Sequence, residues 1–212
     1  TMMNITIIGA SAGVGFEAAK RALDRKHNVT TLSRSPILLP SHTNLTILKG
    51  SATNKADLQK SIKNADAVII ALGTGKNRKT TTLYSDFAKL LVEVQAENNI
   101  QIPFIIVTGF GAGESGAYNG ILAKIFFSLL LRDIYKDKTK MEEIISASTI
   151  KWVIVRPGML KDEPLTEKYR VENKLFKGIK IGSINRSDVA DYLVKEAENT
   201  SSIHKYISLS NK

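Results

Sequence analysis

Cysteine is absent from the 212-residue chain. Disulfide bridges, cysteine nucleophiles and thiolate metal sites are therefore excluded. The three histidines, His27, His42 and His204, lack the spacing of metal ligands, so we expect them at the surface and expect no metal site. A chain without disulfides is compatible with a cytoplasmic protein, which is the location that we expect.

Long apolar runs are also missing. The longest run, residues 121–131, contains Lys124 and is much shorter than the roughly 20 residues that span a bilayer, so we expect no membrane partner. No signal-peptide pattern precedes the first predicted strand. The run is too apolar on all sides for a surface helix. We expect it in the core, with a substrate wall or a subunit contact as alternatives, and the protein as a monomer or homodimer.

Acidic residues are fewer than basic ones. The chain has 30 Lys and Arg against 20 Asp and Glu, which gives a net charge of +10. Such a balance raises the question of nucleic-acid binding. The basic residues are scattered, however, and form no block with interleaved aromatic residues, so we expect no nucleic-acid partner. A positive surface also suits an anionic cofactor.

Strand and helix patterns alternate along the chain. Short β-branched or apolar runs, separated by segments with helical spacing, predict right-handed crossovers and a parallel sheet. We therefore predict an α/β fold: a Rossmann-type doubly wound parallel sheet with helices on both faces and a small C-terminal extension. The length fits a single domain, 1–212, in which 159–185 form a small substrate-side extension. The hydroxyls of Thr80 to Thr82 are placed to cap the helix after the fourth strand.

A glycine-rich loop lies between the first predicted strand and the first predicted helix. Its residues are Gly9, Ala10, Ser11, Ala12, Gly13, Val14 and Gly15. In this setting the first glycine permits a sharp turn, the second lets the backbone approach a pyrophosphate, and the third lets the helix pack close to the sheet. The helix N-terminus offers N–H groups to phosphates, and Ser11 can add a hydroxyl. The loop predicts dinucleotide binding, with a tight turn that binds no ligand as the alternative.

The second strand is not followed by the acidic residue that NAD-binding sites use to hold the ribose 2′-hydroxyl. Arg34 stands there instead, between Ser33 and Ser35. A guanidinium can bind a 2′-phosphate through two hydrogen bonds or stack on adenine, whereas a carboxylate would repel the phosphate. We therefore predict NADP(H) as the preferred cofactor and NAD(H) as the alternative. A solvated surface arginine is the competing interpretation.

Small residues follow the third and fourth predicted strands and leave room for a cofactor across the sheet edge. Ser51 and Ala52 are predicted beside the adenine. Ala71, Leu72 and Gly73 follow the next strand along the chain and complete the predicted adenosine side.

Further segments, in the same order and spacing, resemble the atypical short-chain dehydrogenase/reductase group, and within it the NAD(P)H-binding proteins that include bacterial NADH-flavin reductases and biliverdin reductase B. These segments are 66–73, 109–115, 135–142, 155–158, 162–166 and 186–190. The resemblance implies that the glycine loop holds the pyrophosphate and that Arg34 takes the 2′-phosphate. It also implies that Leu72 and Gly73 line the adenosine and ribose. On the nicotinamide side it implies roles for Thr108, Gly109, Lys138, Pro157, Gly158 and Met159.

One departure from the relatives is chemical. They often have serine where this chain has Gly109, which leaves Thr108 as the neighbouring hydroxyl. Short-chain enzymes acting on alcohols use a tyrosine four residues before the lysine, and Ile134 stands there. Tyr135 is one position off, about 100° around a helix, and we interpret it as a packing residue. Thr108 and Lys138 remain the candidate catalytic residues.

These observations favour an NAD(P)H-dependent reductase that passes a hydride to a flavin, a quinone or a similar planar small molecule. Such an acceptor is already electron-poor, so the protein must mainly hold two flat rings in contact. A non-catalytic NADP(H) sensor that regulates a partner is the main alternative. A nucleotide-sugar epimerase or dehydratase is a weaker one, because the short extension offers little sugar-binding surface.

Overall fold

A mixed sheet forms the centre of the computed structural model, which describes residues 1–75 and 80–212. The eight strands lie in the order β3-β2-β1-β4-β5-β6-β10-β8. Their bounds are Asn4–Ile8 (β1), Asn28–Ser33 (β2), Leu45–Lys49 (β3), Ala67–Ile70 (β4), Pro103–Val107 (β5), Lys151–Pro157 (β6), Tyr169–Glu172 (β8) and Lys205–Asn211 (β10). Neighbouring strands pair in parallel except β8, which is antiparallel to β10. The predicted Rossmann-type fold is confirmed.

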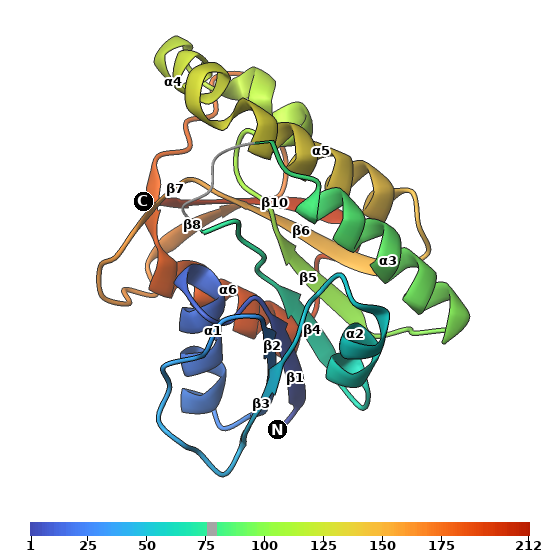
Figure 1. Cartoon of the computed structure of the whole chain (residues 1–212). Helices are drawn as coiled ribbons and strands as arrows, with labels where there is room; N and C mark the ends of the chain where they lie inside the picture. Colours follow the sequence, from blue (N-terminus) through green and yellow to red (C-terminus); the bar gives the residue numbers. More distant parts are fainter. Residues whose placement is uncertain (76–79) are drawn as a thin grey trace.

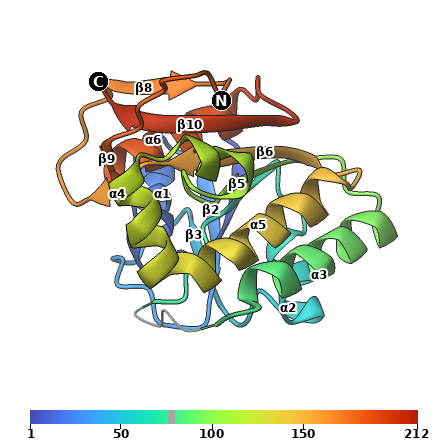
Figure 2. The same cartoon turned by 90° about the horizontal axis from the view of Figure 1, so that it is seen from above.

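Helices cover both faces of the sheet. α1 (Gly13–Asp24) and α6 (Arg186–Glu198) lie side by side on one face, and α2 (Lys55–Ile62), α3 (Leu83–Glu97) and α5 (Arg132–Ser146) lie on the other (Figure 1). The view from above shows α3 and α5 running next to each other (Figure 2). Each face has its own apolar cluster, because the parallel strands are buried on both sides.

The N-terminus of α3 is capped from another helix. Asp137 of α5 is buried, and its carboxylate accepts hydrogen bonds from the backbone N–H groups of Tyr84 (2.8 Å) and Ser85 (3.2 Å). The predicted threonine caps are largely wrong: Thr82 is the N-cap residue but makes no side-chain cap, and only Thr81 accepts from a backbone N–H, that of Leu83. A carboxylate at a helix N-terminus also suits the helix dipole. Asp137 therefore fixes α5 against α3.

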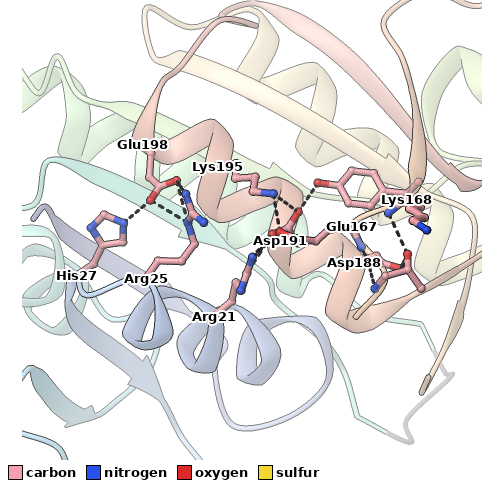
Figure 3. Close-up of polar contacts among 11 residues, drawn as sticks. Arg21, Arg25, His27, Glu167, Lys168, Asp188, Asp191, Lys195 and Glu198 are labelled. Atoms are coloured by element: carbon pink, nitrogen blue, oxygen red, sulfur yellow. Dashed lines mark hydrogen bonds and ion pairs between the residues drawn. The ribbon is translucent and has the colours of Figure 1, made fainter. Parts of the chain in front are cut away.

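Ion pairs join α1 to α6 along their length (Figure 3). Arg21 contacts the buried Asp191 at 2.7 Å, and Arg25 contacts Glu198 at 2.8 Å. The expectation of a surface position for His27 is wrong. Its ring is buried, with Nε2 2.7 Å from Glu198 and Nδ1 accepting from a backbone N–H. The two helices therefore run parallel, with both N-termini at the same end.

The segment that we expected in the core is exposed. It forms α4 (Ile121–Phe126) and a π-helical turn, η2 (Phe127–Leu131), that leads into α5. Its exposed apolar side chains are Ile121, Leu122, Ile125, Phe126, Leu129 and Leu130. The core prediction is wrong because α3 and α5 already cover this face of the sheet, and α4 lies at one end of the molecule, beyond the sheet (Figure 1). In the described ranges 1–75 and 80–212, no helix is long and apolar enough to cross a membrane.

The region after β6 adds three short strands. β7 (Met159–Lys161) pairs in parallel with β9 (Ser183–Asn185) as a separate two-stranded sheet, while β8 joins the edge of the main sheet. A 3-10 helix, η1 (Gly113–Tyr118), lies between β5 and α4. Along the chain, η1 follows the carboxyl end of β5 and β7 follows that of β6.

Candidate functional site

The carboxyl ends of the parallel strands bring the predicted site residues to one edge of the sheet. The glycine loop follows β1, Arg34 follows β2, and Ser51 and Ala52 follow β3. Leu72 and Gly73 follow β4, and Thr108 and Gly109 follow β5. In open α/β sheets, ligands bind outside the carboxyl ends of the strands where the chain order reverses. Here that point lies between β1 and β4.

The glycine loop folds tightly against the neighbouring strand. Gly9 has a φ of +91°, and a Cβ added there would overlap the carbonyl oxygen of Ala71. A Cβ added at Gly15 would overlap the carbonyl oxygen of Gly9, so α1 begins in contact with the end of β1. Gly13 is exposed. The loop therefore has the close packing and the open backbone that phosphate binding requires.

The part of the edge predicted for the adenosine carries an exposed arginine. Arg34 is exposed immediately after β2, while the side chain of Ser33 is buried and bonds the carbonyl of Ser35 at 2.7 Å. The backbone N–H of Ser51 donates to the Asp57 carboxylate at 2.9 Å. The arginine is thus positioned at the carboxyl edge, and its contact with a 2′-phosphate stays a prediction.

A buried ion pair lies directly behind Thr108. Arg156 of β6 is 1% exposed and bonds both carboxylate oxygens of Glu142 in α5, at 2.8 and 3.0 Å. The Thr108 hydroxyl donates to the same carboxylate at 2.8 Å. The guanidinium also stacks over the Tyr206 ring, 4.2 Å from its centroid. The Thr108 hydroxyl proton is therefore committed to Glu142 rather than directed to a substrate.

Lys138 lies beside Thr108, on the side predicted for the nicotinamide. Its ammonium donates to the Thr108 carbonyl at 2.9 Å and lies 4.6 Å from the ring centroid of Tyr135 and 5.5 Å from that of Tyr84. Burial lowers the pKa of Lys138 to about 8, although Glu142 opposes this effect. One donor is used by the carbonyl, so the ammonium has others for a ligand.

Tyr135 packs as the spacing argument expects, and in addition its hydroxyl reaches the loop after β5. A Cβ added at Gly109 would overlap the Tyr135 hydroxyl, so this hydroxyl occupies the space of the side chain that Gly109 lacks. The ring packs edge-on against Phe127, with centroids 4.5 Å apart. Burial raises the pKa of Tyr135 to about 12, so the hydroxyl keeps its proton at neutral pH. In the sequence, Gly109 after β5 together with Tyr135 three residues before Lys138 is the signal that could have indicated this contact.

The last predicted segment closes the far side of this edge. The Pro157 carbonyl accepts from the N–H of Phe110 at 2.9 Å, and Gly158 donates to the Leu209 carbonyl at 2.9 Å. Met159 begins β7 and is 71% exposed. These bonds hold 157–159 next to the loop after β5, in the position expected of a segment that lines the nicotinamide.

Comparisons with known proteins agree with this geometry. An NAD(P)H-binding family model matches residues 9–200. A Bacillus subtilis (strain 168) protein named as an uncharacterized sugar epimerase, YhfK, is 23% identical over 214 residues, covering 98% of this chain and 94% of that protein.

Two solved structures have the same fold over almost the whole chain. One, named as a candidate NADH-flavin reductase from Streptococcus pneumoniae, is 25% identical with a TM-score of 0.81, covering 99% of this chain and 100% of the other. The second is a short-chain dehydrogenase/reductase from Veillonella parvula in complex with NADP, 18% identical with a TM-score of 0.81, covering 100% and 95%. Since the family model spans most of the sequence, this chain belongs to the NAD(P)H-binding family.

Proposed function

We propose that the protein is an NADPH-dependent reductase of a planar, electron-poor small molecule of the flavin or quinone class. The observation that supports it best is the wall beside Gly109. This wall consists of the Tyr135 ring and the Phe127 ring packed edge-on against it, with the exposed apolar side chains of α4 beyond. Aromatic and apolar side chains of this kind suit a planar aromatic acceptor.

The chain's own residues have simple tasks in such a reaction. The glycine loop holds the pyrophosphate on backbone N–H groups, and Lys138 holds the ribose while its ammonium stays anchored to the Thr108 carbonyl. NADPH, when bound, supplies a hydride from its nicotinamide ring. The acceptor takes that hydride and a proton from water. The Tyr135 hydroxyl stabilises the negative charge that develops on the acceptor by donating a hydrogen bond.

Turnover with a panel of acceptors tests this proposal. We expect NADPH oxidation, followed as loss of its absorbance, with at least one flavin or quinone. NADPH binding without turnover on any acceptor would contradict the reductase and favour the non-catalytic sensor. Serving as the control, the same assay without an acceptor measures the background oxidation.

The preference for NADPH over NADH rests on Arg34. A hydrogen bond to a charged group contributes about 1.5–3 kcal/mol, so we expect Arg34→Ala to weaken NADPH binding about tenfold or more. NADH binding should change little, because NADH has no 2′-phosphate. Arg34→Lys keeps the charge but lacks the planar guanidinium, so its affinity for NADPH should lie between those of the unaltered protein and Arg34→Ala. Dissociation constants for both nucleotides measure the effect, and an equal loss for NADPH and NADH would contradict the assignment.

A further inference from the structure

Arg186 lies beside the glycine loop. It is the first residue of α6, and a Cβ added at Gly13 would lie 3.9 Å from its Nε. Gly13 is in turn the first residue of α1. A guanidinium is therefore in van der Waals range of the loop that we assign to the pyrophosphate.

The electrostatic setting of Arg186 is unfavourable without an anion. α1 and α6 run parallel, as their pairs Arg21–Asp191 and Arg25–Glu198 show, so both helix N-termini lie together (Figure 3). Helix N-termini have partial positive charge and disfavour a nearby cation. An arginine in the first turn of one helix and beside the first residue of another adds its charge to two positive helix ends. Asp188 lies in the first turn of α6, but α1 has no acidic residue in its first turn. Such an arrangement calls for a negative partner.

In this structure the partner is Asp162, and the pair is weak. Arg186 Nη1 lies 2.9 Å from Asp162 Oδ1. The Asp162 side chain is 83% exposed and the Arg186 side chain 29% exposed. Exposed ion pairs contribute little to stability, because water solvates both charges well. Asp162 can therefore give up the guanidinium to a more highly charged anion.

The surrounding turn is fixed without this pair. Buried Asp188 accepts hydrogen bonds from the backbone N–H groups of Thr166 (2.9 Å) and Glu167 (3.0 Å), and the Ser187 hydroxyl donates to the Glu163 carbonyl. A cavity of about 340 Å³ separates α1 from the turn, with Arg186 in its lining. The guanidinium thus has room to change partner while the backbone keeps its position.

We propose that Arg186 is a ligand of the cofactor's pyrophosphate and that it exchanges Asp162 for the phosphate oxygens when the dinucleotide binds. This inference rests on the dinucleotide position in the proposed function, but not on any turnover. Guanidinium donors match phosphate oxygens in pairs. Asp162 directly follows β7, so the exchange also links the phosphate loop to the segment 157–159 on the nicotinamide side.

A double-mutant cycle on dissociation constants tests the exchange. We expect Arg186→Ala to weaken NADPH and NADH binding alike by about tenfold, because both nucleotides have the pyrophosphate. We expect Asp162→Asn to strengthen both by about twofold to fivefold, since it removes a competing partner. In the Arg186→Ala background, Asp162→Asn should change neither constant. Arg186→Lys keeps the charge, and its loss should be intermediate.

Lys151→Ala is the matched control. It removes one positive charge at the start of β6, on the opposite edge of the sheet. A loss in Arg186→Ala no larger than in this control would overturn the proposal, as would a loss confined to NADPH, which would place Arg186 on the 2′-phosphate. Thermal midpoints of all variants show whether they fold. Nucleotide binding without turnover would contradict the reductase and leave this inference standing, whereas no binding by the unaltered protein would remove both.

Discussion

Glu142→Ala should lower the free energy of unfolding by about 3–5 kcal/mol, because it removes one partner of a buried ion pair. The substitution leaves Arg156 1% exposed and without its carboxylate. It also takes away the acceptor of the Thr108 hydroxyl and opens space beside the stacked Tyr206 ring. Urea unfolding followed by circular dichroism measures the change.

The neighbouring residue provides the control. Glu143 is exposed, so Glu143→Ala should change stability by no more than about 0.5 kcal/mol, as surface substitutions usually do. A loss below about 1 kcal/mol in Glu142→Ala would mean that water solvates Arg156 well enough to replace the carboxylate. In that case the ion pair behind Thr108 would not be what holds the Thr108 side chain in place.

Gly15→Ala should reduce the affinity for NADPH and NADH by about a hundredfold, which corresponds to two lost hydrogen bonds of about 1.5 kcal/mol each to the phosphates. The added Cβ would overlap the Gly9 carbonyl oxygen, so the loop must move away from α1. The free energy of unfolding of Gly15→Ala gives an independent measure of the clash between the added Cβ and the Gly9 carbonyl. Alanine is a better helix former than glycine by about 1 kcal/mol, so a helix without the clash would become more stable.

Gly120→Ala is the matched control for this substitution. A Cβ at Gly120 meets nothing within 4 Å. Both nucleotides should bind this variant as they bind the unaltered protein. A stabilised Gly15→Ala variant with unchanged affinity would show that the glycine serves neither packing nor phosphate binding.

Local sequence patterns were sufficient for the fold and for the sheet edge. Buried parallel strands read as continuous apolar runs, so β1, β4, β5 and β6 stood out, and the residues after each strand had to meet at one edge. The glycine loop could be located because its tight turn is formed by adjacent residues. Prediction worked where the physical cause is local in the chain.

Prediction failed where the cause is a distant partner. Nothing in the local sequence indicates that Glu142 is buried, because its partner Arg156 comes from another element. His27 is buried through Glu198, which is 171 positions away. Tyr135 reaches Gly109 although its spacing from Lys138 differs from that of the known tyrosine enzymes. Spacing describes one helix alone, whereas the fold decides which strand end that helix faces.

The position of β10 has a consequence for the order in which the protein can fold during synthesis. β10 lies between β6 and β8, although β8 comes earlier in the chain. Until residues 205–211 leave the ribosome, β6 presents an unpaired edge and β8 has no strand to join. Unpaired edges of this kind invite association with other chains. The nascent chain therefore passes through an interval in which chaperone protection is most valuable.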